Sequence, residues 1–98
     1  MSNLKFCQIN AENLFLLFDN PLPINYLKLE RKQWESLTAA DFENKPLSKV
    51  IHLAHTLIDI DADIVMLNEV GSVESLKNFN QYFLDSKYSP ILVEGNSD

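Results

Sequence analysis

The sequence has little cysteine, little glycine and no long hydrophobic run. It contains one Cys and two Gly in 98 residues. A single thiol cannot form an intramolecular disulfide, so we expect Cys7 to be a small core residue in a reducing compartment. No run approaches the ~20 apolar residues needed to cross a bilayer, and the N-terminus lacks the apolar region of a signal peptide. These absences predict a cytoplasmic protein with no membrane partner.

Basic residues are also scarce. The chain has 8 Lys and Arg against 14 Asp and Glu, which gives a formal net charge of −6. Proteins that grip nucleic acid through its phosphates usually show a basic face, so the charge argues mildly against a nucleic-acid clamp. Hydrophobic residues make up 46% of the sequence, enough for a real core rather than disorder. The length corresponds to one small domain over 1–98.

The pattern of apolar residues predicts a strand, a helix and a second strand. Residues 4–10 alternate with apolar groups on both sides, so we expect both faces of this strand to be covered. Residues 46–59 have helical spacing, with Pro46 in the first turn. Residues 64–68 form a short apolar strand. A strand–helix–strand order favours a right-handed crossover and parallel strands. The inner face of the helix is predicted to consist of Leu47, Val50, Ile51, Ala54, Leu57 and Ile58.

The rest of the chain completes an α/β pattern. Ser72 is a plausible N-cap for a helix over 72–84, and 88–93 resembles a third strand. Residues 11–25, with two prolines, are expected to leave the first strand through a loop, and 26–37 form a weakly patterned helix. The predicted order is strand–helix–strand–helix–strand.

Two stretches place polar side chains at the ends of the predicted strands. In "KFCQINAENLF" the strand stops at Asn10, with Glu12 just beyond, and in "IVMLNEVGS" it stops at Asn68 and Glu69. Carboxyl ends of neighbouring parallel strands share one edge of the sheet, where ligands bind in open α/β folds. A carboxylate beside Asn amides suits a hard cation such as Mg²⁺. The alternative is that Glu69 is simply the first polar residue after a core strand.

Two other polar groupings have ordinary explanations. "DIDAD", with Asp59, Asp61 and Asp63, resembles the start of a calcium loop but lacks its glycine and its closing Glu at the required spacing. We interpret it as a solvated helix exit and strand entry. His52 and His55 are three residues apart on the predicted helix. This spacing could bind a metal, and it also fits two solvent-facing side chains.

The two strand-end stretches together resemble the first two motifs of the endonuclease/exonuclease/phosphatase superfamily. In that family a strand ends in an Asn followed by an acidic residue, and an aspartate-led strand, here "DADIVMLNEV", ends in a Glu. The resemblance implies that Glu69 binds the metal, Mg²⁺ or Mn²⁺, and that Asn10 lies beside the metal and the scissile phosphate. Glu12 matches an acidic position that contributes to the metal site in some members. Asn68 stands where many members have Gln.

The resemblance implies a partial α/β sandwich, the N-terminal portion of the DNase I-like fold, truncated within a single domain. The implied reaction is metal-assisted hydrolysis of a phosphoester by water, as in a nuclease or phosphatase. The family's catalytic His and general base are not in this sequence, so we expect these 98 residues to be inactive alone. We also expect uncovered apolar surface, with self-association or dependence on the missing C-terminal portion. This surface is predicted to include Phe15, Leu17, Phe18 and Trp34.

A hypothesis of a different class is a small non-catalytic α/β interaction module whose acidic surface binds a basic partner. A metal titration separates the two, because only the phosphoesterase hypothesis predicts a response confined to Asn10, Glu12 and Glu69. The sequence does not identify the substrate, which the resemblance limits only to a nucleic acid or a small phosphorylated molecule.

Overall fold

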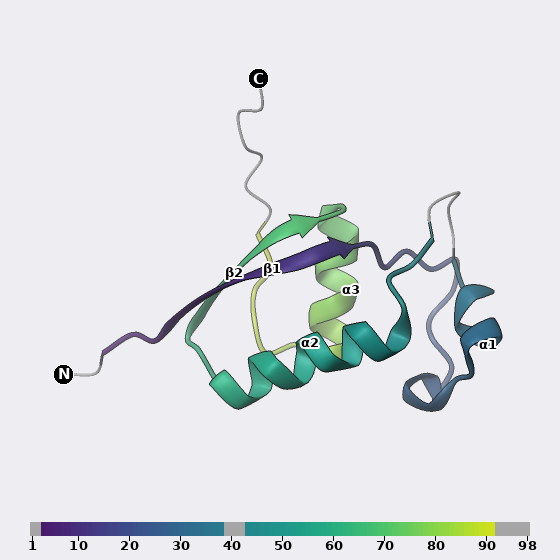
Figure 1. The fold of residues 1–98 in the computed structure, drawn as a ribbon, viewed down its shortest axis with the longest axis horizontal. Coiled ribbons are helices and arrows are strands. Elements are labelled where there is room, and N and C mark those ends of the chain that lie inside the picture. The colour runs from purple at the N-terminus through teal and green to yellow at the C-terminus, as the bar shows by residue number, and fades with distance from the viewer. Residues whose placement is uncertain (1–2, 39–42, 92–98) are drawn as a thin grey trace, which may run out of the picture.

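The computed structural model describes residues 3–38 and 43–91, which form a mixed α/β fold. It has two strands, β1 (Phe6–Leu14) and β2 (Ile64–Val70), and a short 3₁₀ turn, η1 (Tyr26–Lys28). Its helices are α1 (Arg31–Glu35), α2 (Leu47–Ile60) and α3 (Val73–Phe83). The strands form a two-stranded parallel sheet, as the sequence predicts. Figure 1 shows α2 and α3 on one side of the strands, with α1 beyond the end towards which β1 points.

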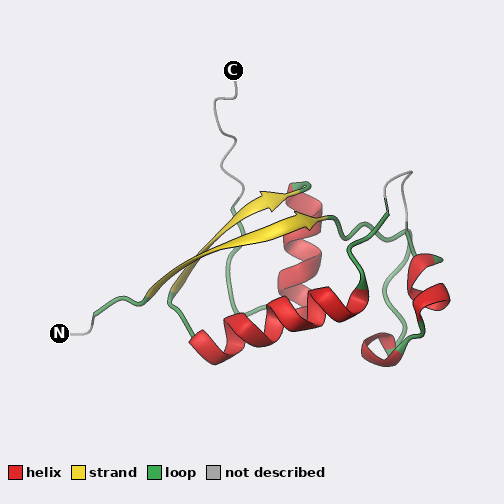
Figure 2. Ribbon diagram, in the orientation of Figure 1, coloured by secondary structure: helices red, strands yellow, loops and turns green. Residues whose placement is uncertain are grey.

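The two strands pair in register up to the predicted site and then shift. Phe6 lies opposite Ile64 and Asn10 opposite Asn68, but the next partners are Leu14 and Val70. Three residues of β1 therefore face one residue of β2, which is a bulge. The predicted strand ends at 10 and 68 are wrong, because pairing resumes beyond the bulge and the strands end at Leu14 and Val70. Figure 2 shows the two strands side by side as arrows that point the same way.

Helix α2 confirms the predicted helix over 46–59. It begins after Pro46, whose fixed φ suits a helix start, and ends at Asp61, which adopts a left-handed conformation as C-cap. Its buried side chains include Val50, Ala54 and Leu57, as expected. The prediction that Ile58 belongs to the inner face is wrong, because Ile58 is 52% exposed. Leu53, which the prediction leaves out, is buried.

Helix α3 also confirms its prediction, including the cap. The hydroxyl of Ser72 accepts a hydrogen bond from the backbone N–H of Ser75 at 3.1 Å. The predicted third strand over 88–93 is wrong over the described residues, which continue to Ile91 without strand pairing, and 92–93 lie outside them. The side chain of Asn80 holds this segment instead, because it binds both the N–H and the C=O of Tyr88. These bonds satisfy backbone groups that a strand would pair with a neighbour.

The predicted helix over 26–37 is only partly correct, since it divides into η1 and α1. Trp34 anchors α1: it is 2% exposed, its indole N–H donates to the C=O of Lys45 at 2.9 Å, and its ring contacts Phe18 and Phe83 edge-on. The prediction that Trp34 is uncovered is therefore wrong. Phe15 and Phe18 are partly buried rather than bare.

Within residues 3–38 and 43–91, only one face of the sheet is covered, so the prediction that both faces of the first strand are buried is wrong. Cys7 and Ala11 are buried on the side of α2 and α3, which confirms Cys7 as a core residue. On the opposite face, Phe6 is 60% and Met66 47% exposed. We call this second surface the bare face; its members are Phe6, Gln8, Asn10, Ile64, Met66 and Asn68. Among the described residues, none of the helices is long and apolar enough to cross a lipid bilayer.

Candidate functional site

The side chains of Asn10 and Glu69 meet at the carboxyl-terminal edge of the sheet. Asn10 pairs in register with Asn68, and Glu69 is the next residue along β2. The Nδ2 of Asn10 donates a hydrogen bond to Oε2 of Glu69 at 2.7 Å, and both residues are exposed. The predicted convergence of these two side chains on neighbouring parallel strands is confirmed. We call this edge, with Asn10, Glu12, Asn68 and Glu69, the rim.

Left-handed backbone conformations explain how Glu69 reaches the rim. In a regular strand its side chain would share the covered face with Val65 and Leu67, because side chains alternate. Glu69 instead has φ 59°, and Glu12 and Asn13 opposite it have φ 52° and 60°. A left-handed non-glycine residue costs roughly 1–2 kcal/mol. The bulge thus redirects the Glu69 carboxylate from the core to solvent, and such strain is concentrated at functional sites.

Asn10 uses both ends of its amide. Its Oδ1 accepts the backbone N–H of Glu12 at 2.7 Å, while its Nδ2 binds Glu69. The first contact is a local turn of the kind that Asn side chains stabilise. It fixes the orientation of the amide, so the N–H group has to face the carboxylate. Asn10 therefore positions Glu69, and Glu12, whose backbone N–H it accepts, is exposed.

Lys45 supports the same turn from outside the sheet. Its Nζ donates to the backbone C=O of Glu12 at 2.7 Å, although the two residues are 33 positions apart. Sequence reasoning did not include Lys45, because a single Lys before a proline carries no pattern that would place it near the rim. Only the path of the chain through α1 brings it there.

A tight contact closes the rim behind Glu69. The N–H of Gly71 donates to the C=O of Leu14 at 2.9 Å, which continues the strand pairing past the bulge. A Cβ at Gly71 would clash with the ring of Phe15. Glycine is required here because the ring of Phe15 lies against the backbone of Gly71, and this close packing restricts where the preceding Glu69 can lie.

The rim is not a closed metal cage. Within residues 3–38 and 43–91, no three His, Cys, Asp or Glu side chains gather as a metal-binding group. Mg²⁺ does not require such a group, since it keeps several waters and is held by one or two carboxylates plus substrate phosphates. The exposed carboxylate of Glu69, oriented by Asn10, fits that mode, with Glu12 nearby as a second carboxylate.

The other predicted polar groupings lie away from the rim. Asp61 caps α2 and forms an ion pair with Lys87; the hydrogen bond and the charge of Lys87 lower the pKa of Asp61. Asp63 accepts the backbone N–H of Lys5 at 2.7 Å. "DIDAD" is thus a solvated helix exit and strand entry, as predicted. His52 and His55 are exposed on α2.

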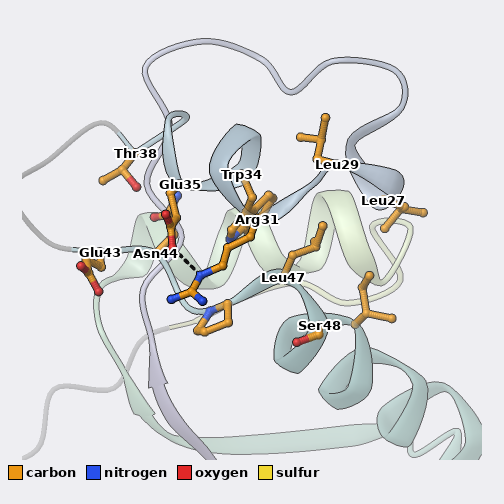
Figure 3. Close-up of a pocket in the computed structure, with 12 residues that line it drawn as sticks. Leu27, Leu29, Arg31, Trp34, Glu35, Thr38, Glu43, Asn44, Leu47 and Ser48 are labelled. Atoms are coloured by element: carbon orange, nitrogen blue, oxygen red, sulfur yellow. Dashed lines mark hydrogen bonds and ion pairs between the residues drawn. The ribbon is translucent and has the colours of Figure 1, made fainter.

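A cavity of about 890 Å³ lies between α1 and the start of α2 (Figure 3). Trp34 and Leu47 line it, and the exposed Arg31–Glu35 ion pair, at 3.1 Å, borders it. None of the rim residues lines this cavity. It therefore adds nothing to the metal-binding hypothesis.

No family model matches the chain, and neither curated proteins nor solved structures give a match.

Proposed function

We propose that this chain carries the metal-binding rim of a Mg²⁺- or Mn²⁺-dependent phosphoesterase of the endonuclease/exonuclease/phosphatase superfamily, within a DNase I-like fold. The single observation that supports this most is the 2.7 Å hydrogen bond from Asn10 to Glu69, which joins the carboxyl ends of two adjacent parallel strands. Both residues belong to the motifs that resemble that family. The parallel pairing and the intervening α2 agree with the same interpretation.

Each rim residue has a distinct role in the proposal. Glu69 holds the cation through its exposed carboxylate, and Asn10 is a positioning residue that keeps this carboxylate turned towards solvent. Glu12 supplies a second negative charge across the bulge. A cation bound there would offset charge on the phosphate oxygens of a substrate. The catalytic His and general base of that superfamily are not matched in this chain, so the chain alone is expected to bind metal without useful turnover.

The test is a Mg²⁺ titration of the ¹⁵N-labelled chain, repeated with Mn²⁺ for paramagnetic broadening. We expect saturable changes confined to the amides of residues 10–13 and 68–71. Glu69→Gln should remove them, because it keeps the size of the side chain but not its charge. Glu74→Gln is the matched control, since Glu74 is an exposed carboxylate on α3 that forms an ion pair with Lys77.

Two outcomes would count against the proposal. Changes spread over all acidic residues would indicate weak charge screening rather than a site. No response at the rim would favour the non-catalytic interaction module, whose acidic surface binds a basic partner. Activity is a separate measurement: robust diesterase turnover by this chain, abolished by Glu69→Ala, would refute the expectation that it is inactive alone.

A further inference from the structure

A groove of about 420 Å³ lies between β1 and α2, next to the rim. Its apolar floor includes Ile9 and Leu53, and its polar lining consists chiefly of Asn10, Glu12, Lys45, Lys49 and His52. We call it the basic groove. Because Asn10 and Glu12 also belong to the rim, a molecule in the groove would reach the proposed cation site.

Lys45 is the most unusual residue in this groove. It is only 9% exposed, and lysine is rarely this buried unless it is paired with an acid. Within residues 3–38 and 43–91, no carboxylate forms an ion pair with it. Its one side-chain hydrogen bond goes to the backbone C=O of Glu12, and an ammonium group has three donors. Within the described residues, the ammonium group of Lys45 therefore has donors that no protein group accepts.

The backbone of Lys45 is fixed on both sides. Its N–H donates to the C=O of Phe15 at 2.9 Å, and its C=O accepts the indole N–H of Trp34 at 2.9 Å. Trp34 is itself 2% exposed. These contacts fix the backbone of Lys45, and the bond from Nζ to the C=O of Glu12 holds the ammonium group, which reduces the entropy lost on binding.

We propose that the basic groove binds the phosphate group of a small phosphorylated molecule through Lys45 and Lys49. The inference rests on the proposed function and deepens it, because Asn10 lines the groove and also binds the Glu69 carboxylate. A volume of about 420 Å³ suits one nucleotide-sized ligand. The net charge of −6 disfavours a long polyanion, which would meet repulsion beyond the groove. Glu12 is a carboxylate in the lining and weakens anion binding, but Lys45 and Lys49 outweigh its charge.

The experiment is an NMR titration of the whole ¹⁵N-labelled chain with inorganic phosphate, adenosine 5′-monophosphate or adenosine, with a chelator present. We expect saturable shifts at Asn10, Glu12, Lys49 and His52 with both phosphate ligands and not with adenosine. Lys49→Gln should weaken binding about tenfold, because it removes a positive charge from the groove. The Lys49 side chain is exposed, and within residues 3–38 and 43–91 no ion pair is lost with it. Lys45→Met should weaken it at least as much. Glu12→Gln should tighten it severalfold.

The control is Lys32→Gln, which removes the same charge from α1, away from the groove, and should change the affinity less than twofold. The proposal is overturned if Lys32→Gln weakens binding as much as Lys49→Gln, or if adenosine shifts the same amides. It is also overturned if phosphate causes no saturable shift. Because no divalent metal is present, this failure is independent of the Mg²⁺ titration, which tests the rim alone.

Discussion

The covered and bare faces of the β1–β2 sheet both carry apolar side chains, but only the covered face is buried by the described helices. On the covered face Ala11 is 2% exposed, whereas Phe6 on the bare face is 60% exposed. The difference lies in the helices: α2 and α3 both pack on the same side. An apolar stripe in a strand therefore shows that a face can be covered, and the position of other elements decides whether it is.

The largest effect should separate the two faces by stability. Phe79→Ala removes a ring that is 0% exposed and should lower the free energy of unfolding by about 3–5 kcal/mol. Phe6→Ala removes an exposed ring and should change it by less than about 0.5 kcal/mol. Urea denaturation at low protein concentration measures both. Equal losses would mean that the bare face is covered in solution.

A polar contact inside the covered side should have the next largest effect. The hydroxyl of Ser75, 0% exposed, accepts the backbone N–H of Leu16 at 2.9 Å. Ser75→Ala leaves this donor buried without a partner and should cost about 1–3 kcal/mol. Ser89→Ala, at an exposed position, is the control and should be nearly neutral. The same urea measurement applies, and equal midpoints for the two variants would contradict the expected role of Ser75.

The bare face should drive self-association at high concentration, because exposed apolar patches do so. Phe6→Ser combined with Met66→Ser should weaken association by at least tenfold, because each side chain is about half exposed and full burial of one is worth roughly 1.5–3 kcal/mol. Ile24→Ser is the control, since Ile24 is an apolar residue with 101% exposure that lies outside the sheet. Sedimentation velocity over a concentration series measures the effect. Association that is lost equally in the control would not be specific to the bare face.

The smallest effect concerns pH and the ion pair at the end of α2. The hydrogen bond and charge of Lys87 lower the pKa of Asp61 in the folded state. In acid the unfolded chain therefore binds more protons than the folded one. The contribution of this ion pair to the free energy of unfolding is present above the ordinary Asp pKa of about 3.9, and it is lost as pH falls towards the lower pKa of the folded state.

Asp61→Asn should therefore reduce the acid dependence of the urea midpoint between about pH 5 and pH 2. The exposure of both side chains keeps the effect small. An unchanged pH dependence in Asp61→Asn would show that this pair adds nothing to stability.

The limits of prediction are clearest at the rim. Apolar runs ending at Asn10 and Glu69 were enough to predict that these side chains meet, because parallel strands share one edge. The left-handed φ of Glu69 could not be predicted, since nothing about Glu favours it. The third strand was mispredicted from 88–93 because its apolar residues fit a strand, while the side chain of Asn80 takes the backbone bonds of Tyr88.

The sequence by itself determined the order and type of the main elements: the spacing of apolar residues defines α2 and α3, and the Ser72 cap defines where α3 starts. It also determined which strand ends carry carboxylates and amides. Only the tertiary structure decided that one face of the sheet stays bare, that a bulge turns Glu69 outward, and that Lys45 lies beside Glu12. These features depend on contacts between residues far apart in the chain, which local spacing does not encode.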